Sequence, residues 1–209
     1  MGCELGKLAS STKSDDVNAT SPIEPPPPSA PDPRLPLTAR QKYTMIASWK
    51  GISRAMQPTG INMFIKLFED HGELLGLFNK FRELKTKEQQ ASSEELAEHA
   101  NKVMETLDEG IRGLDELDAF FDFLHQVGAS HTRIPEFRPE YFWKIEKPFL
   151  SAVEDTLGDR YTENVEGIYK LTIKFIIETL ITGFESANSK NSTAAVNNNS
   201  NSTSANANS

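Results

Sequence analysis

Two of the four histidines in this 209-residue chain, His99 and His131, are the residues best placed to do chemistry. His99 follows Leu96 by three residues and precedes Val103 by four, so at 100° per residue all three share one face of a predicted helix. His131 falls on the apolar face of the next predicted helix, with Leu117. Burying an imidazole without a partner costs about 1–3 kcal/mol, so each ring should hydrogen-bond, bind a metal or border a cavity.

Two inward-facing imidazoles on consecutive helices allow two interpretations. A single histidine on an apolar face is more often a hydrogen-bonded core residue than a ligand, whereas two opposed rings favour an iron held between them. The sequence has no Cys-x-x-Cys-His motif, so a haem at this place would be bound without thioether bonds. His125 lies toward the edge of its apolar face, and we expect it to be a surface or capping residue.

The elements that must position these histidines are helices. Apolar residues between positions 37 and 186 recur at spacings of three and four, and the alternation typical of strands is absent. Thr38 can cap the first helix, Pro58 can open the second, and Asp159 or Thr162 can begin the last. The pattern predicts an all-α fold of six or seven helices.

The helix that carries His99 has its own boundary signals. Ser92 and Glu95 form a capping-box pair before it, and Gly113 ends it. Farther along, a helix is predicted from about Glu140, and Pro148 inside it predicts a kink and a lost backbone hydrogen bond.

Composition divides the chain into three parts. Eight of the twelve prolines lie between Pro22 and Pro36, so residues 1–36 are expected to form a disordered, proline-rich tail. Residues 37–186 form one predicted domain, and residues 187–209, mostly Asn and Ser, a second disordered tail. The domain is long enough to bury roughly 70% of its unfolded surface in one core. Most of the net charge of −8 falls on it, which argues against nucleic acid as a partner.

The only cysteine, Cys3, follows Gly2 at the start of the sequence. One cysteine forms no internal disulfide, and no apolar signal sequence follows Met1, so we expect an intracellular protein. Gly2 is placed for myristoylation, although Gly6 stands where the usual pattern has Ser or Thr. One myristoyl chain binds membranes only marginally and the tail has no basic cluster, so palmitoylation of Cys3 is the expected second signal. The alternative is an ordinary disordered tail.

Acylation would place the protein at the cytoplasmic face of the plasma membrane, with the stretch from Pro22 to Pro36 as a semi-rigid spacer. Without acylation we expect it in the cytosol.

Three stretches of the sequence resemble the globin family. Residues 96–103 resemble the distal helix, with His99 as the distal histidine, and residues 128–142 resemble the proximal region, with His131 as the axial ligand. Residues 77–87 resemble the corner at which a family phenylalanine stacks on the haem. The resemblance runs from about Thr38 to Phe184, and it implies a globin fold of six to eight helices in a three-over-three sandwich.

The resemblance also implies the cofactor, haem b, and its contacts. His131 and His99 are the implied proximal and distal iron ligands, and Ser130 the hydroxyl that helps to orient the proximal ring. The other residues implied to contact haem are Phe64, Phe78, Phe81, Val103, Lys102, Phe137 and Phe142. Two positions depart from the family pattern: Gly72 replaces a usual proline, and Pro148 is unusual within its helix.

The spacing of 32 residues between His99 and His131 is similar to that of neuroglobins and cytoglobins. Together with this spacing, the resemblance to neuroglobins implies a six-coordinate iron held by both histidines, with roles in redox signalling, in sensing, or in reactions with O₂, NO, nitrite or superoxide. Diatomic gases (O₂, NO, CO) are the expected partners, together with an electron donor that the sequence does not identify. The alternatives are a soluble oxygen-storage globin in which His99 stabilises O₂ without binding iron, and a helical interaction module without haem. No acid–base pair or nucleophile stands out, so enzymatic activity stays open.

Overall fold

The apolar spacing of the sequence is realised as helices connected by short turns. The computed structural model describes residues 32–80 and 82–203, with side chains as far as residue 190, and no strand occurs in these ranges. The α-helices are α1 (Ala39–Ser53), α2 (Met56–Asp70), α3 (Lys87–Ala91), α4 (Glu94–Arg112), α5 (Leu117–Ser130), α6 (Glu146–Leu157) and α7 (Glu163–Thr203). The 3₁₀ segments are η1 (Gly72–Leu77), η2 (Gly113–Asp115), η3 (His131–Arg133), η4 (Pro139–Ile145) and η5 (Gly158–Arg160).

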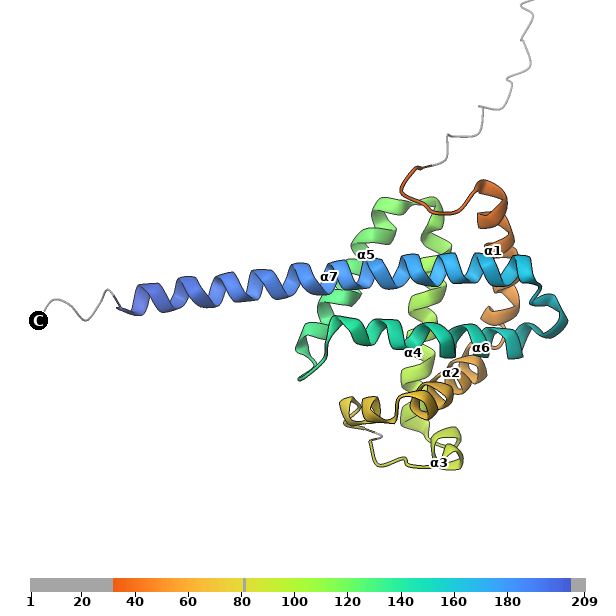
Figure 1. Cartoon of the computed structure of the whole chain (residues 1–209), viewed down its shortest axis with the longest axis horizontal. Coiled ribbons are helices and arrows are strands. Elements are labelled where there is room, and N and C mark those ends of the chain that lie inside the picture. Colours follow the sequence, from red (N-terminus) through yellow and green to blue (C-terminus); the bar gives the residue numbers. More distant parts are fainter. Residues whose placement is uncertain (1–31, 81, 204–209) are drawn as a thin grey trace, which may run out of the picture. The chain divides into compact units, whose positions relative to one another are not determined.

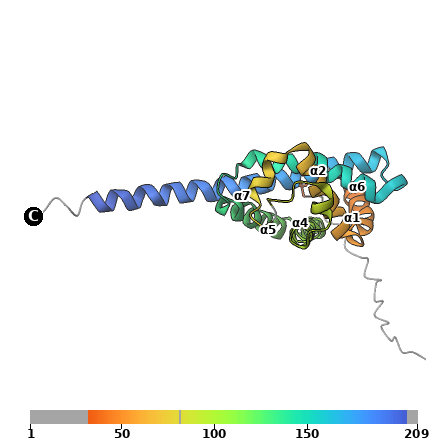
Figure 2. The same ribbon diagram turned by 90° about the horizontal axis from the view of Figure 1, so that it is seen from below.

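The long helices form two layers. Helices α1, α4 and α5 lie in one layer, and α2, α6 and α7 in the other (Figure 2). The layers pack on each other through the pairs α5 with α7, α2 with α4, and α1 with α7. This arrangement confirms the predicted all-α, three-over-three fold.

Helices α1, α4 and α7 begin at capping residues that either are the predicted ones or lie one residue away. Thr38 caps α1 in a capping box, in which Gln41 N–H bonds the Thr38 hydroxyl and the Gln41 side chain bonds back to the cap. Thr162 accepts a bond from Val165 N–H at the start of α7. The prediction of Ser92 as the cap of α4 is wrong by one residue. Ser93 is the cap, because its hydroxyl accepts the Leu96 N–H at 3.2 Å.

The predicted kink at Pro148 is also wrong. The segment from Pro139 to Ile145 is a 3₁₀ helix, and α6 begins only at Glu146, so Pro148 occupies the third position of α6. The N–H groups in the first turn of an α-helix have no acceptor within the helix, so a proline there removes no hydrogen bond.

The core joins the two layers around large buried side chains. Tyr169 of α7 is fully buried, and its ring centroid lies 6.3 Å from that of Trp49 in α1. Trp49 Nε1 donates to Asp108 of α4 at 2.7 Å, and the Ser53 hydroxyl donates to the same oxygen at 2.8 Å. Burial would raise the pKa of Asp108, but these bonds and one from Arg112 outweigh it and lower the pKa. The carboxylate thus ties α1 to α4.

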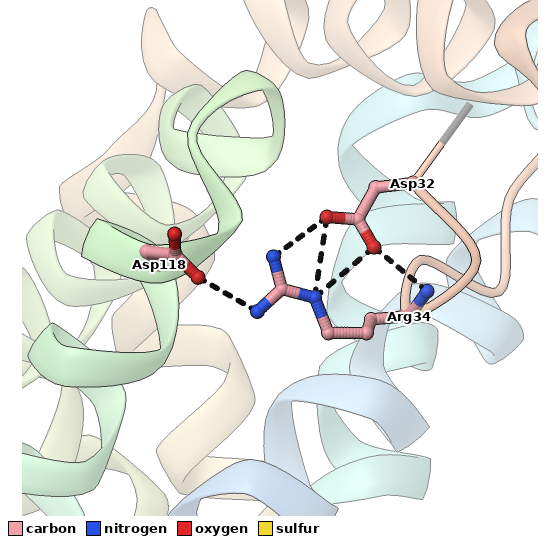
Figure 3. Close-up of polar contacts among 3 residues, drawn as sticks. All are labelled: Asp32, Arg34 and Asp118. Atoms are coloured by element: carbon pink, nitrogen blue, oxygen red, sulfur yellow. Dashed lines mark hydrogen bonds and ion pairs between the residues drawn. The ribbon is translucent and has the colours of Figure 1, made fainter. Parts of the chain in front are cut away.

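The segment before α1 is fixed to the domain by one ion-pair group and one buried side chain. The Arg34 guanidinium bonds Asp32 and, at 2.7 Å, Asp118 in the first turn of α5 (Figure 3). It also lies 5.3 Å from the centre of the Phe121 ring. The Leu37 side chain is only 5% exposed.

Helix α7 continues as helix past the domain boundary predicted at residue 186, as far as Thr203 (Figure 1). Gly2, Cys3, Phe81 and nearly all of the predicted tail 1–36 lie outside the described residues.

Candidate functional site

His131 stands at the C-terminal end of α5, with its ring held by the helix backbone. Its Nδ1 lies 2.8 Å from the carbonyl oxygen of Val127. A carbonyl oxygen only accepts, so Nδ1 carries the proton of the neutral ring and the lone pair is on Nε2. The Ser130 hydroxyl donates to the same carbonyl at 2.6 Å. Ser130 therefore acts on the oxygen that orients the ring, and sequence reasoning missed Val127 because a backbone acceptor has no residue signature.

Two phenylalanines flank the His131 ring. The centroid of Phe142 lies 4.8 Å away in an edge-to-face arrangement, and that of Phe137 lies 5.0 Å away. Phe142 is buried and comes from η4, whereas Phe137 lies in the turn before it and is half-buried. The structure therefore places both of these predicted residues beside His131.

His99 of α4 lies against a second aromatic group. Its ring centroid is 5.1 Å from Phe64 of α2 and 5.2 Å from Phe78, both edge-to-face. Phe68, one turn after Phe64 on α2, contacts both phenylalanines, with centroid distances of 5.8 and 5.4 Å. Phe68 was not singled out from the sequence, although its spacing of four residues from Phe64 could have shown it.

Burial lowers the pKa of both imidazoles and so favours their neutral forms. Burial, followed by the charges of His131, Lys102 and Lys80, lowers the pKa of His99 to about 4. Burial also lowers the pKa of His131, against the opposing effect of the Val127 carbonyl. Neutral imidazole is the form that binds a metal, so both rings are ready to act as ligands.

The other predicted site residues that the structure describes, Val103 and Lys102, lie on α4 one turn after His99. Val103 is half-buried and Lys102 is exposed, and the buried face of α4 at this level is formed by Met104 instead. The charge on Lys102 nevertheless reaches His99. Within the described ranges no cluster of three or more His, Cys, Asp and Glu side chains could hold a metal ion. A metal bound at this site would therefore need other ligands in addition to the two histidines.

The comparisons with known proteins agree with this geometry. The family model described as Globin matches residues 61–180, which is more than half of the chain. The chain is a globin. Two neuroglobins are similar to it: the one from Tetraodon nigroviridis is 27% identical over 71% of this chain and 92% of its own. That from Dissostichus mawsoni is 31% identical over 60% of this chain and 79% of its own.

A solved structure extends the similarity to three dimensions. The crystal structure of a hexacoordinated haem protein from an anhydrobiotic tardigrade is 38% identical to this globin, with a TM-score of 0.71. The match covers 74% of this chain and 99% of the tardigrade chain.

Haem b is the cofactor of the globin family, and the site suits it. A porphyrin has large apolar faces and a metal that takes axial nitrogen ligands. Edge-to-face phenylalanines flank both histidines, and the two rings present neutral nitrogen donors. Bound haem would itself supply the remaining nitrogen ligands that the protein side chains lack, with His131 and His99 as the protein's donors.

Proposed function

We propose that this globin binds haem b with His131 as the proximal ligand and His99 as a direct distal ligand, which makes the iron six-coordinate. The observation that carries the proposal is the pair of imidazoles, each flanked by aromatic side chains and favoured in its neutral form by burial, with His131 near enough for its charge to act on His99. The tardigrade protein, 38% identical, is titled a hexacoordinated haem protein, which supports the same coordination here.

The chain's own residues have separate tasks in this proposal. The Val127 carbonyl fixes the His131 ring and makes Nε2 the donor atom. Phe64 and Phe78 pack edge-to-face against the His99 ring and hold it in place. The low pKa of His99 keeps its lone pair free of protons down to about pH 4. When bound, haem b supplies a redox-active iron that takes up small diatomic ligands.

Direct binding by His99 decides the functional class. An external ligand must compete with the His99 imidazole, so bulk oxygen storage is disfavoured. We propose a role in redox signalling or sensing, or in reactions with O₂, NO, nitrite or superoxide. Oxygen storage is the competing function, and it requires His99 to stay off the iron.

The visible spectrum of the ferrous protein without O₂ distinguishes the two functions. Two sharp bands are expected for two nitrogen ligands, and a single broad band would contradict the proposal. His99→Leu should convert the paired bands into the broad one, because only the proximal ligand is left. His131→Ala should lose haem during purification, and normal haem retention in that variant would refute the proximal assignment.

We further propose that Gly2 is myristoylated and Cys3 palmitoylated, which anchors the globin at the cytoplasmic face of the plasma membrane. The support is the sequence Met-Gly-Cys and the need of a singly acylated protein for a second membrane signal. In the described residues no helix has the length and apolar character to cross a bilayer.

Membrane fractionation of the full chain in cells tests the anchor. Gly2→Ala should move the protein to the soluble fraction, and Cys3→Ser should leave it weakly and reversibly bound. Ser10→Ala, outside the motif, should fractionate like the wild type. A Gly2→Ala protein that stays with the membranes would rule out the myristoyl anchor.

A further inference from the structure

Helices α5 and α7 meet backbone to backbone just before the proximal histidine. A Cβ atom added to Gly128 of α5 would lie 2.9 Å from the Leu180 carbonyl carbon of α7, and closer still to its oxygen. A Cβ atom on Gly183 of α7 would lie 2.5 Å from the His125 Cα of α5, and would also overlap the His125 carbonyl oxygen. Each helix contributes one glycine, and the two contacts lie one helical turn apart on each helix. No other residue type fits either position without moving the helices.

This contact is connected to the His131 ring through one peptide unit. The carbonyl that holds His131 Nδ1 belongs to Val127, and its carbon is bonded to the nitrogen of Gly128. The peptide group is planar and rigid, so a displacement of Gly128 moves the Val127 oxygen with it. The direction in which the imidazole points is therefore tied to how deeply α5 sits on α7.

A second connection runs through Phe184, the residue after Gly183. Its ring centroid lies 5.8 Å from that of Phe137 and 6.3 Å from that of Phe142. These are the two phenylalanines that flank the His131 ring, and the Phe184 side chain is only 7% exposed. One turn of α7 thus supports both the backbone that orients the imidazole and the side chains that enclose it.

We propose that Gly128, Gly183 and Phe184 are positioning residues that set the location and orientation of the His131 imidazole. This inference rests on the proposed function only in taking His131 as the proximal ligand. It assigns to α7 a role beyond packing. The glycine contact sets the distance between α5 and α7, and Phe184 supports the phenylalanines that flank the His131 ring.

The first test uses Gly128→Ala and Gly183→Ala in the full haem-loaded chain. Each added methyl group meets backbone, which cannot rotate away, so α5 must move outward. Haem should dissociate about 10- to 100-fold faster, as is usual when the groups that orient a metal-binding histidine are disturbed. The iron–histidine stretching band in resonance Raman spectra, recorded on these variants in a His99→Leu background, should shift. Gly167→Ala is the matched control, because it lies on α7 with open space around it, and it should match the wild type in both measurements.

A loss of general stability must be told apart from misplacement of the ring. Ile173→Ala removes a buried side chain of α7 away from the proximal residues, so it should lower the melting temperature and leave the Raman band unchanged. Phe184→Leu keeps the helix contact and removes only the aromatic wall, so it should fold and still shift the band. If the glycine variants do not fold, Phe184→Leu alone decides.

The outcomes separate this inference from the proposed function. The positioning role would be overturned if the glycine variants and Phe184→Leu showed the same iron–histidine Raman band and the same rate of haem loss as Gly167→Ala. A wild-type protein without paired ferrous bands would overturn six-coordination and leave the proximal test valid. Normal haem retention in His131→Ala would overturn the proximal assignment itself, and with it the positioning role.

Discussion

The two imidazoles differ in the charges that reach them. His131 is surrounded by phenylalanine rings and a backbone carbonyl, and only the carbonyl opposes the effect of burial on its pKa. Burial is the main cause of the low pKa of His99, about 4, and the charges of Lys102 and Lys80, with that of His131 once it is protonated, lower it further. Neighbouring positive charge therefore adds to the effect of burial at the distal ring, whereas at the proximal ring a backbone carbonyl opposes it.

This difference predicts how the haem-free protein responds to acid. The pKa of His99 is about 4 in the folded chain against 6.5 when unfolded, so the unfolded chain takes up the proton first as the pH falls. The stability that neutral His99 provides is complete above pH 6.5 and is lost as the pH falls toward 4. When the pH is lowered from 7 to 4.5, the free energy of unfolding should fall by about 2–3 kcal/mol less in His99→Leu than in the wild type. Urea titrations of both apoproteins measure this difference, and parallel curves would contradict it.

The sequence predicted the site residues to different extents. Periodicity alone placed His99 and His131 on inner faces, because the phase of a helix is readable from its apolar residues. The resemblance to globins added Phe64 and Phe78, which the structure places against His99. The Val127 carbonyl could not be predicted, because every residue carries that group and only the folded backbone shows which one meets the ring.

Helix starts were predicted less accurately than helix faces. Ser92 and Ser93 both suit a cap by residue type, and only the hydroxyl that reaches a free N–H decides between them. Ser92, the residue that follows α3, instead donates its hydroxyl to the Glu88 carbonyl of that helix. Pro148 shows the same limit, since a proline in the first turn and one in the middle of a helix look alike until the first residue of the helix is known. The end of α4 before Gly113 was predicted correctly.

The cap of α4 can be tested with adjacent serines. Ser93→Ala removes the acceptor of the Leu96 N–H and should cost about 1 kcal/mol, the usual value of a cap. In a chain of this size that lowers the melting temperature by about 2–4 °C. Ser92→Ala is the matched control and should change it much less. Equal losses for the two variants in thermal unfolding would contradict the assignment of Ser93.

The junction of α1 and α4 depends on one carboxylate. Asp108→Ala leaves the Trp49 Nε1 donor and the Ser53 hydroxyl without their acceptor in a largely buried place. Leaving such groups unpaired costs about 1–3 kcal/mol, and the emission of Trp49 should change as its hydrogen bond is lost. Glu109→Ala, the exposed neighbour on α4, should alter neither the stability nor the fluorescence. An Asp108→Ala protein as stable as Glu109→Ala would show that α1 and α4 are held by apolar packing alone.

Across the whole domain, small residues let helices of the two layers approach closely where they cross. Gly60 of α2 faces Ala100 of α4, where an added Cβ would lie 3.0 Å from the Ala100 carbonyl oxygen. Gly128 and Gly183 make the equivalent crossing of α5 and α7. One crossing stands next to His99 and the other three residues before His131, so the same close packing that joins the layers also positions both predicted ligands.

The segment that precedes α1 shows which kind of contact holds the described domain together. Arg34 makes the most conspicuous polar contacts there, yet its side chain is 47% exposed and that of Asp118 is 89% exposed. Exposed ion pairs contribute about 0–1 kcal/mol, because water screens them and both side chains lose freedom. Leu37, only 5% exposed, should contribute more, since removing a buried leucine side chain costs about 2–5 kcal/mol. Arg34→Ala should therefore shift the denaturation midpoint little and only at low salt, whereas Leu37→Ala should lower it strongly at every salt concentration. The reverse order of the two variants would mean that the ion pair, and not apolar burial, fastens this segment to the domain.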